Sequence, residues 1–242
     1  MATAGDTTVG LRGSPRNLTT VLRMPPFGPG LVPVELEIAE VALPSPLLAA
    51  VAPSGIADVA RLMLSLPGAT PPGRYEGAIR LSTRSHSLVV EVEPYLSIAV
   101  LPEGLAARAR PSEELNVDLT VLNQGNVSYD VRKVYAFPLA DVIGIDRALS
   151  RTASSETKEG GRGRADRFAD ELASGRGGPV RVEVHRGVGS VAPREVREIK
   201  ATLKLPSRLK LGRTYSGAWR LADAAFSVRI EVGDESFEEE AR

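Results

Sequence analysis

Two stretches of the chain, PGATPPGRYEGAIRL at residues 67–81 and PSRLKLGRTYSGAWRL at residues 206–221, carry the same pattern. In each, a proline precedes a glycine, and a Tyr-x-Gly-Ala-apolar-Arg-Leu segment follows. Tyr75 and Tyr215 stand 140 residues apart, and this offset holds as far as Val92. A fixed internal period sets the architecture of a chain. The sequence therefore predicts two related domains in tandem.

The residues around each copy alternate in the way that is typical of strands. Before the first turn, Leu62, Leu64 and Leu66 alternate with Met63 and Ser65, a period of two that indicates a half-buried strand. After the turn, one face of each copy carries Tyr75, Gly77, Ile79 and Leu81 or Tyr215, Gly217, Trp219 and Leu221. Two antiparallel strands after such a corner are typical of the end of an immunoglobulin-like sandwich.

A family resemblance follows from these corners and from one further segment. Gly77 and Gly217 stand where an antibody domain has its second cysteine, and this chain has no cysteine. LNVDLTVLNQGNVS at residues 115–128 resembles the Asn-x-Gly-Asn hairpin of bacterial cell-adhesion-related and glycosidase-associated modules. The chain thus resembles tandem bacterial immunoglobulin-like modules. The resemblance implies an all-β fold of two antiparallel β-sandwiches and no single function, since that family is a scaffold with many uses.

The division into domains follows from the two copies. We expect a flexible N-terminus over residues 1–7, a first domain over 8–94 and a second over 95–233. An acidic tail, residues 234–242, is expected to be disordered. Because the linker at Pro94 is very short, we expect the two domains to form a nearly rigid pair.

One segment of the second domain, at about residues 140–178, departs from the β pattern. Its apolar residues recur at helical spacing: Val142, Ile145, Leu149, Phe168 and Leu172. Asp141 is a candidate N-cap. Residues 151–164 are polar and rich in glycine, which predicts a mobile tip. The sequence therefore predicts a helical insertion between two strands.

The apolar residues of this insertion have two interpretations. They could pack on the second sandwich and cap its open end, because amphipathic helices usually serve their own fold. They could instead bind a partner subunit, because loops on rigid scaffolds often carry binding. Outward residues such as Glu76, Arg80 and Arg220 indicate polar sandwich faces. The insertion is therefore the candidate partner-binding surface.

The composition bounds the chemistry. Thirty Lys and Arg balance thirty Asp and Glu, so no overall field favours nucleic acid or an anionic membrane. The lack of cysteine excludes disulfides, thiol catalysis and cysteine-based metal sites. His86 and His185 lie far apart and outside any metal-binding spacing. We predict no catalytic residue, no cofactor and no metal, and therefore no enzyme.

The start of the chain suggests a location. Residues 1–9 have neither a basic start nor an apolar segment, so no signal peptide is expected. The most apolar window, residues 41–51, is broken by Pro44 and Pro46 and is too short to span a bilayer. The expected location is the cytoplasm, although a piece trimmed from an exported protein would carry the same pattern.

These features favour a non-catalytic structural or interaction protein. We expect a rigid two-domain β scaffold that is a building block or adaptor in a larger bacterial assembly, with a protein partner or a further copy of itself. One alternative is an exported adhesion or carbohydrate-binding module, which the aromatic content of 5% disfavours. Another is a pilus-type two-domain chaperone, which would need an exposed donor strand and a periplasmic signal.

Overall fold

The computed structural model describes residues 8–23, 29–38, 41–56, 59–81, 84–153 and 161–233. The predicted flexible N-terminus, the acidic tail and residues 154–160 of the predicted tip lie outside the described residues. The chain is mostly β, with two short helices, and divides into two compact units. The first unit holds residues 1–97, 123–128 and 192–194, and the second holds the remainder.

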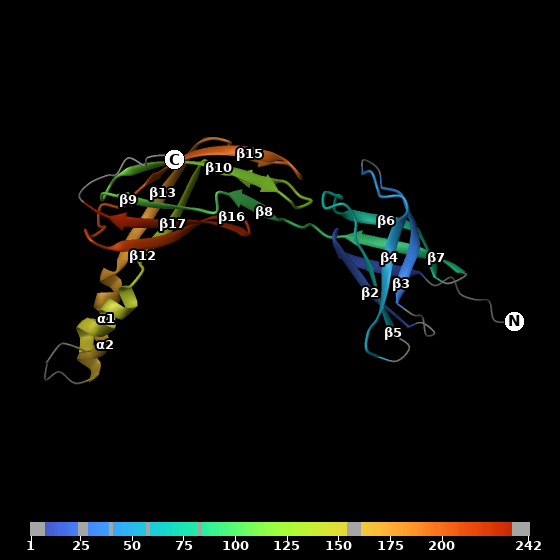
Figure 1. Cartoon of the computed structure of the whole chain (residues 1–242), viewed down its shortest axis with the longest axis horizontal. Coiled ribbons are helices and arrows are strands. Elements are labelled where there is room, and N and C mark those ends of the chain that lie inside the picture. Colours follow the sequence, from blue (N-terminus) through green and yellow to red (C-terminus); the bar gives the residue numbers. More distant parts are fainter. Residues whose placement is uncertain are drawn as a thin grey trace. The chain divides into compact units, whose positions relative to one another are not determined.

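The strands of the first unit close into a barrel. They are β1 (Val9–Ser14), β2 (Asn17–Arg23), β3 (Gly30–Leu36), β4 (Leu47–Pro53), β5 (Val59–Leu64), β6 (Gly73–Leu81) and β7 (Arg84–Val92) (Figure 1). Their order is β1-β2-β5-β4-β3-β6-β7. All neighbours in this order are antiparallel, and the barrel closes because β1 pairs with β2 on one side and, in parallel, with β7 on the other.

The second unit is built on one larger sheet. Its strands are β8 (Ile98–Leu101), β9 (Gly104–Ala109), β10 (Glu114–Asn123), β11 (Tyr129–Val131), β12 (Val134–Asp141), β13 (Arg176–Arg186), β14 (Gly189–Val191), β15 (Val196–Lys204), β16 (Thr214–Leu221) and β17 (Ala224–Val232). Eight of them follow the order β8-β10-β15-β13-β12-β16-β17-β9, and β11 pairs with β14. The two helices, α1 (Gly144–Ala153) and α2 (Gly161–Ser174), lie between β12 and β13.

The two units share one strand order but differ in how it closes. In the second unit the strand equivalent to β1 is split, so β8 pairs with β10 while β9 pairs in parallel with β17. The predicted all-β class is confirmed. The finer prediction of two sandwiches is not confirmed, because the first unit forms a closed barrel and the second a continuous eight-stranded sheet.

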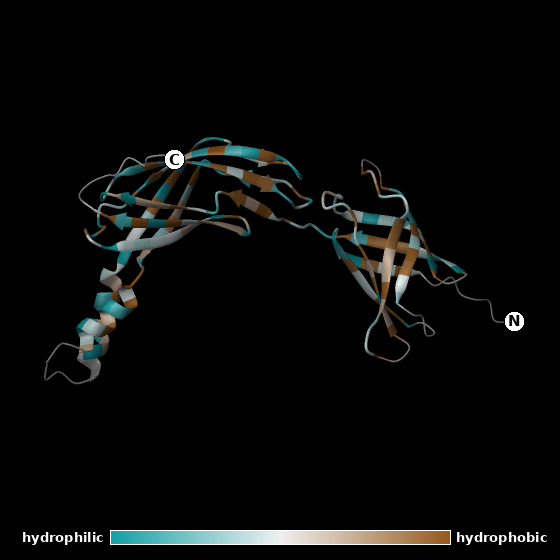
Figure 2. Cartoon of the chain, viewed as in Figure 1, coloured by the Kyte–Doolittle hydropathy of each residue, from teal (hydrophilic) through white to brown (hydrophobic). Residues whose placement is uncertain are grey.

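Each unit has its own apolar core, built from the inward side of alternating strands (Figure 2). In the second unit Trp219, Tyr215 and Phe226 are fully buried. The ring centroids of Tyr135 and Trp219 are 5.3 Å apart, and the planes are tilted by 59°. Such aromatic pairs stabilise a core beyond the area that they bury.

The hairpin motif that carries the family resemblance provides a buried polar anchor in the first unit. The Asn126 side chain is buried and binds three backbone groups. Its Oδ1 accepts the Tyr95 N–H at 2.6 Å, and its Nδ2 donates to the Thr70 and Glu93 carbonyl oxygens, each at 3.0 Å. A buried amide is stable only when it is hydrogen-bonded in this way.

Candidate partner-binding surface

The predicted insertion contains two helices that form a hairpin at one end of the second sheet (Figure 1). Helix α1 runs to Ala153 and helix α2 begins at Gly161, so the prediction of a mobile tip over residues 151–164 is wrong for residues 151–153 and 161–164, which are helical. The hairpin leaves the sheet at Asp141 and returns at Gly175, where the Asp141 N–H donates to the Gly175 carbonyl oxygen at 2.9 Å. Its two ends are therefore adjacent in space.

Asp141 anchors the base of the hairpin. Its side chain is 1% exposed, and its carboxylate accepts hydrogen bonds from Arg147 of α1 and, at 3.2 Å, from Arg213 just before β16. The same carboxylate accepts the Ile143 N–H at 3.2 Å, two residues along the chain. Asp141 thus stabilises the turn before α1 rather than standing directly at the helix start, as an N-cap would. These bonds connect α1 to the end of β12 and to the residue just before β16. A buried carboxylate is stable only when such charged partners surround it.

Contacts between the helices complete the hairpin. Ala148 of α1 is buried. Arg151 of α1 donates to Glu171 of α2 at 2.9 Å. At the end of α2, the Gly175 N–H donates to the Glu171 and Leu172 carbonyl oxygens, each at 3.1 Å. The two helices therefore pack against each other beyond the base, which Asp141 fixes.

One side of the hairpin is apolar and exposed. Ile143 is 51% exposed but lies off the helical spacing of its apolar neighbours. Val142 is 48% exposed, Ile145 63% and Leu149 53%, and their spacing places these three on one side. This set, which we call the hairpin face, does not cover the sheet of its own unit. Phe168 and Leu172 on α2 are half-buried instead. The sequence pattern missed Ile143, because it lies off the helical spacing.

A shallow groove lies beside the base of the hairpin, on the outer side of β12 and β13. It encloses about 410 Å³, and the residues around it are Ala136, Phe137, Pro138, Leu139, Ala140, Arg176, Gly178, Pro179 and Arg208. Its lining is apolar apart from Arg176 and Arg208. The groove therefore adds apolar surface near the base of the hairpin, and the cationic side chains of Arg176 and Arg208 border it.

The predicted corner residues lie in the sheets, Tyr75 and Gly77 on β6 and Tyr215 and Gly217 on β16, and Tyr215 pairs with Asp141 at the base of the hairpin. Tyr215 is buried, and its hydroxyl accepts the Lys210 N–H at 3.2 Å. Tyr75 is half-buried, and its hydroxyl donates to the Pro71 carbonyl oxygen at 2.8 Å. Each tyrosine thus bonds to the backbone of the turn just upstream.

The corner glycines permit a close backbone approach. A Cβ on Gly77 would lie 2.3 Å from the Glu35 carbonyl oxygen, and a Cβ on Gly217 would lie 2.5 Å from the Pro138 carbonyl oxygen. Neither gap admits a side chain. The shared Tyr-x-Gly spacing therefore reflects the same strand-to-strand contact in both units.

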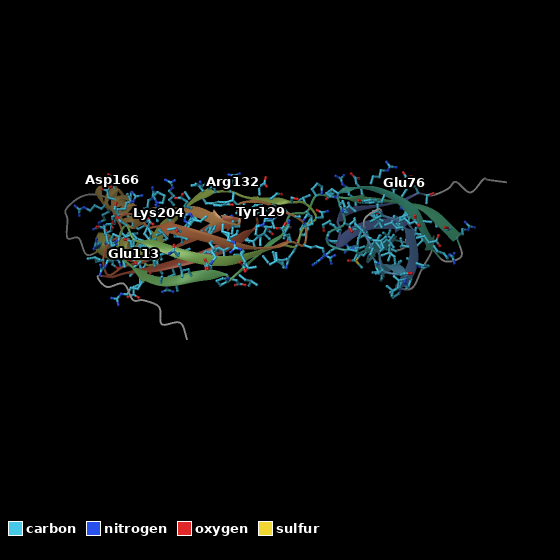
Figure 3. All side chains as sticks on the ribbon, turned by 90° about the horizontal axis from the view of Figure 1, so that it is seen from above. Glu76, Glu113, Tyr129, Arg132, Asp166 and Lys204 are labelled. Atoms are coloured by element: carbon cyan, nitrogen blue, oxygen red, sulfur yellow. The ribbon has the colours of Figure 1, made fainter. Side chains whose placement is uncertain are left out.

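Among the described residues, no group of three or more His, Asp or Glu side chains has the geometry of a metal site. His185 Nε2 lies 2.8 Å from the Thr202 hydroxyl, and His86 is a half-buried residue of β7. Burial raises the pKa of Tyr129, whose hydroxyl lies 3.4 Å from that of Tyr135. Figure 3 shows Tyr129 and, at the helical end of the same unit, Asp166.

Comparisons with known proteins give structural neighbours only. No family model and no curated protein match the chain. Similar solved structures include domains 1–6 of the surface layer protein SbsC, at 15% identity and a TM-score of 0.26, covering 84% of this chain and 20% of that one. The I67–I69 fragment of titin is 9% identical with a TM-score of 0.28, covering 93% of this chain and 62% of that one.

The extracellular portion of mouse CD200RLa is 8% identical with a TM-score of 0.31, and the match covers 94% of this chain and all of that one, 100%. The structural neighbours thus include immunoglobulin-like domains, as the sequence resemblance predicted, and they identify no particular protein. The chain spans a fifth of the surface-layer fragment and less than two thirds of the titin fragment. No helix in the described ranges is long and apolar enough to cross a membrane.

Proposed function

We propose that the protein is a non-catalytic structural or interaction protein, in which two immunoglobulin-like sandwich modules, residues 8–94 and 95–233, form a rigid scaffold. In this proposal it is a building block or adaptor of a larger bacterial assembly in the cytoplasm.

The observation that carries the proposal is the hairpin face. Val142, Ile145 and Leu149 are about half exposed or more on a hairpin whose base is fixed by the buried Asp141 carboxylate. Exposing apolar side chains to water is unfavourable, and fixing them beforehand lowers the entropy cost of binding. A protein partner that covers this stripe with an apolar groove or helix would gain both effects. The hairpin face is therefore the docking surface in this proposal.

The test compares three versions of the full chain, each purified by affinity from the native host. Ile145→Asp with Leu149→Asp places two charges on the hairpin face, and Ala169→Asp places one on an exposed position of α2. We expect one defined protein to co-purify with the wild type and with Ala169→Asp but not with the double variant. If the same protein co-purified equally with a folded double variant, the hairpin face would not be the docking surface.

A further inference from the structure

The outer side of four neighbouring strands in the first unit, β2-β5-β4-β3, carries many apolar side chains. They form what we call the four-strand face: Val21, Leu31, Pro33, Leu48, Ala50, Ala52 and Met63. Thr19, Arg23 and Arg61 point to the same side from β2 and β5. Val21 is 59% exposed and Leu31 65%, whereas their neighbours along the chain point into the barrel or its rim. The expectation of polar faces is therefore wrong here. A contiguous exposed apolar surface of this kind usually marks an interaction site.

The second unit serves as an internal control for this face. Because the strand order and register are the same, the two faces can be matched residue by residue. Four matched pairs replace an apolar side chain by a polar or charged one, first unit before second: Val21/Asp118, Leu48/Arg181, Ala50/Glu183 and Met63/Thr202. On β3 and β12, the matched pairs Leu31/Val134 and Pro33/Ala136 are apolar in both units. On the second face Lys200 bonds to Asp118 at 3.0 Å and Lys204 to Glu114 at 2.8 Å (Lys204 is labelled in Figure 3).

This comparison shows that the fold itself does not require apolar residues on the outer side of β2, β5 and β4. The second unit has the same strands and carries charged or polar side chains at the positions of Val21, Leu48, Ala50 and Met63, whereas the outer side of its β12 is apolar as well. Its pairs at the surface contribute little to stability, but they make the surface favourable in water. The apolar residues at these four positions of the first unit are therefore best explained by a surface that is covered in the working protein.

Two charged residues border the four-strand face at opposite corners. Arg61 lies directly opposite Val21 and has no ion-pair partner among the described residues, whereas the matched Lys200 has Asp118. At the other corner, on β3, Glu35 is strongly exposed and lies 4.0 Å from Arg80, a distance that implies a weak pair. The cation and the anion of this face thus lie on a diagonal.

The strand register fixes the centre of that diagonal. Arg61 lies one outward position beyond Met63 along β5, next to Ala52 of β4. Glu35 lies two outward positions beyond Leu31, in the opposite direction, on β3. The midpoint falls on β4, between Leu48 and Ala50. Consider a two-fold axis that passes through this midpoint, lies in the plane of contact and runs perpendicular to the diagonal. This axis places Arg61 of one copy against Glu35 of the other copy.

We propose that the four-strand face is the interface between two copies of this chain, packed face to face about this axis, with Arg61 of each copy paired to Glu35 of the other. Apolar sheets pack about 10 Å apart, and the small side chains of Ala50 and Ala52 at the centre permit that approach. The closed barrel offers no free strand edge in its described strands, so the face is the available surface. Two-fold dimers are also the commonest oligomers. This proposal stands independently of the hairpin face.

The first experiment measures the mass of the full chain by sedimentation at about 100 μM, a concentration at which a dimer with a Kd in the micromolar range is well populated. Val21→Asp, Ala50→Glu and Met63→Thr together give the four-strand face the residues of the second unit. We expect the wild type to be a dimer and this triple variant to be a monomer with an unchanged circular dichroism spectrum. The hairpin variant Ile145→Asp with Leu149→Asp is the matched control and should remain a dimer.

The second experiment tests the geometry through the two charges. Arg61→Glu and Glu35→Arg alone should each weaken the dimer about tenfold or more, and the two together should restore it. A monomeric wild type at this concentration would overturn the proposal and leave the face to a different protein. A folded triple variant that remained a dimer would also overturn it, as would a double charge exchange that failed to restore association.

Discussion

The two units fold on one strand order, yet each modifies it at a different place. In the first unit β1 reaches both of its neighbours and closes a barrel. In the second unit the same role is divided between β8 and β9. Each unit has its own buried apolar core, although only the first unit closes into a barrel. The fold therefore does not require closure of the barrel. Both units share the Tyr-x-Gly corner, where the tyrosine of β6 or β16 bonds to the turn just upstream and the glycine lies against the backbone of β3 or β12.

The connection after the third strand differs more. Between β3 and β4 the first unit has residues 37–46, whereas between β12 and β13 the second has the helical hairpin. The hairpin begins and ends at adjacent residues, so the sheet accommodates it without a change in register order. Additions at such positions on a rigid scaffold are where proteins place binding surfaces. The comparison thus distinguishes the strands, which both units share, from the surface that the hairpin adds to the second unit alone.

The largest expected difference concerns the paired tyrosines. Tyr215→Ala should lower the free energy of unfolding of the second unit by about 4 kcal/mol, because a fully buried aromatic ring is removed. Tyr75→Ala should cost the first unit only about 2 kcal/mol, because this ring is half-buried and the loss is mainly packing and one hydrogen bond. Urea unfolding measures both. Trp219, the single tryptophan, reports the second unit, and circular dichroism reports both. A larger cost for Tyr75→Ala than for Tyr215→Ala would contradict the packing described here.

A slightly smaller effect is expected at the base of the hairpin, which the first unit lacks. Asp141→Ala should destabilise the second unit by about 3 kcal/mol, because Arg147 and Arg213 then lose their shared buried carboxylate. Trp219 fluorescence during urea unfolding measures this loss. Glu171→Ala removes only the more exposed pair with Arg151 and is the control, with an expected cost below about 1 kcal/mol. Equal costs for the two variants would show that Asp141 is not the anchor.

The corner glycines should respond alike in the two units. Gly77→Ala and Gly217→Ala should each cost about 2 kcal/mol, because the new methyl group meets a backbone carbonyl oxygen of the neighbouring strand. Thermal unfolding followed by circular dichroism measures both variants. Gly10→Ala, where a Cβ meets nothing within 4 Å, is the control. If either corner variant were as stable as the control, the close approach at that corner would not hold.

The smallest effect on stability is expected from removing the outer part of the hairpin. Replacing residues 150–165 with a short Gly-Ser link keeps Asp141 with Arg147 and should change the free energy of unfolding of either unit by less than about 1 kcal/mol, because the first unit folds without such an insertion. Trp219 fluorescence and circular dichroism check this. Loss of the cooperative unfolding of the second unit would instead show that the hairpin is part of its core.

The repeat carried most of what the sequence could predict about the fold. The alternation around Tyr75 and Tyr215 predicted the last two strands of each unit, and the helical spacing predicted the insertion. Closure into a barrel was not predictable, because it depends on whether one strand pairs on both sides, and periodicity does not report pairing partners. The start of α2 was missed because glycines at residues 161 and 163 read as a loop, and helix contacts outweigh their low propensity.

The exposed apolar surfaces were harder to predict from the sequence than the fold was. The apolar residues of α1 were visible in the pattern, but their exposure depends on which way the hairpin leaves the sheet. The four-strand face was missed because Leu48, Ala50 and Met63 alternate with core residues and resemble a strand that is buried on both sides. Matching the two copies residue by residue could have revealed it, since Ala50 corresponds to Glu183.

Photo-cross-linking in the native host tests the central claim, a docking surface on the hairpin, most directly. A photoreactive phenylalanine analogue replaces Ile145 on the hairpin face in one version of the chain and Ala169 on the polar side of α2 in another. The account predicts one cross-linked protein of defined mass from position 145 and none from position 169. Equal cross-linking from both positions, or none from position 145 while the chain is folded and expressed, would contradict it.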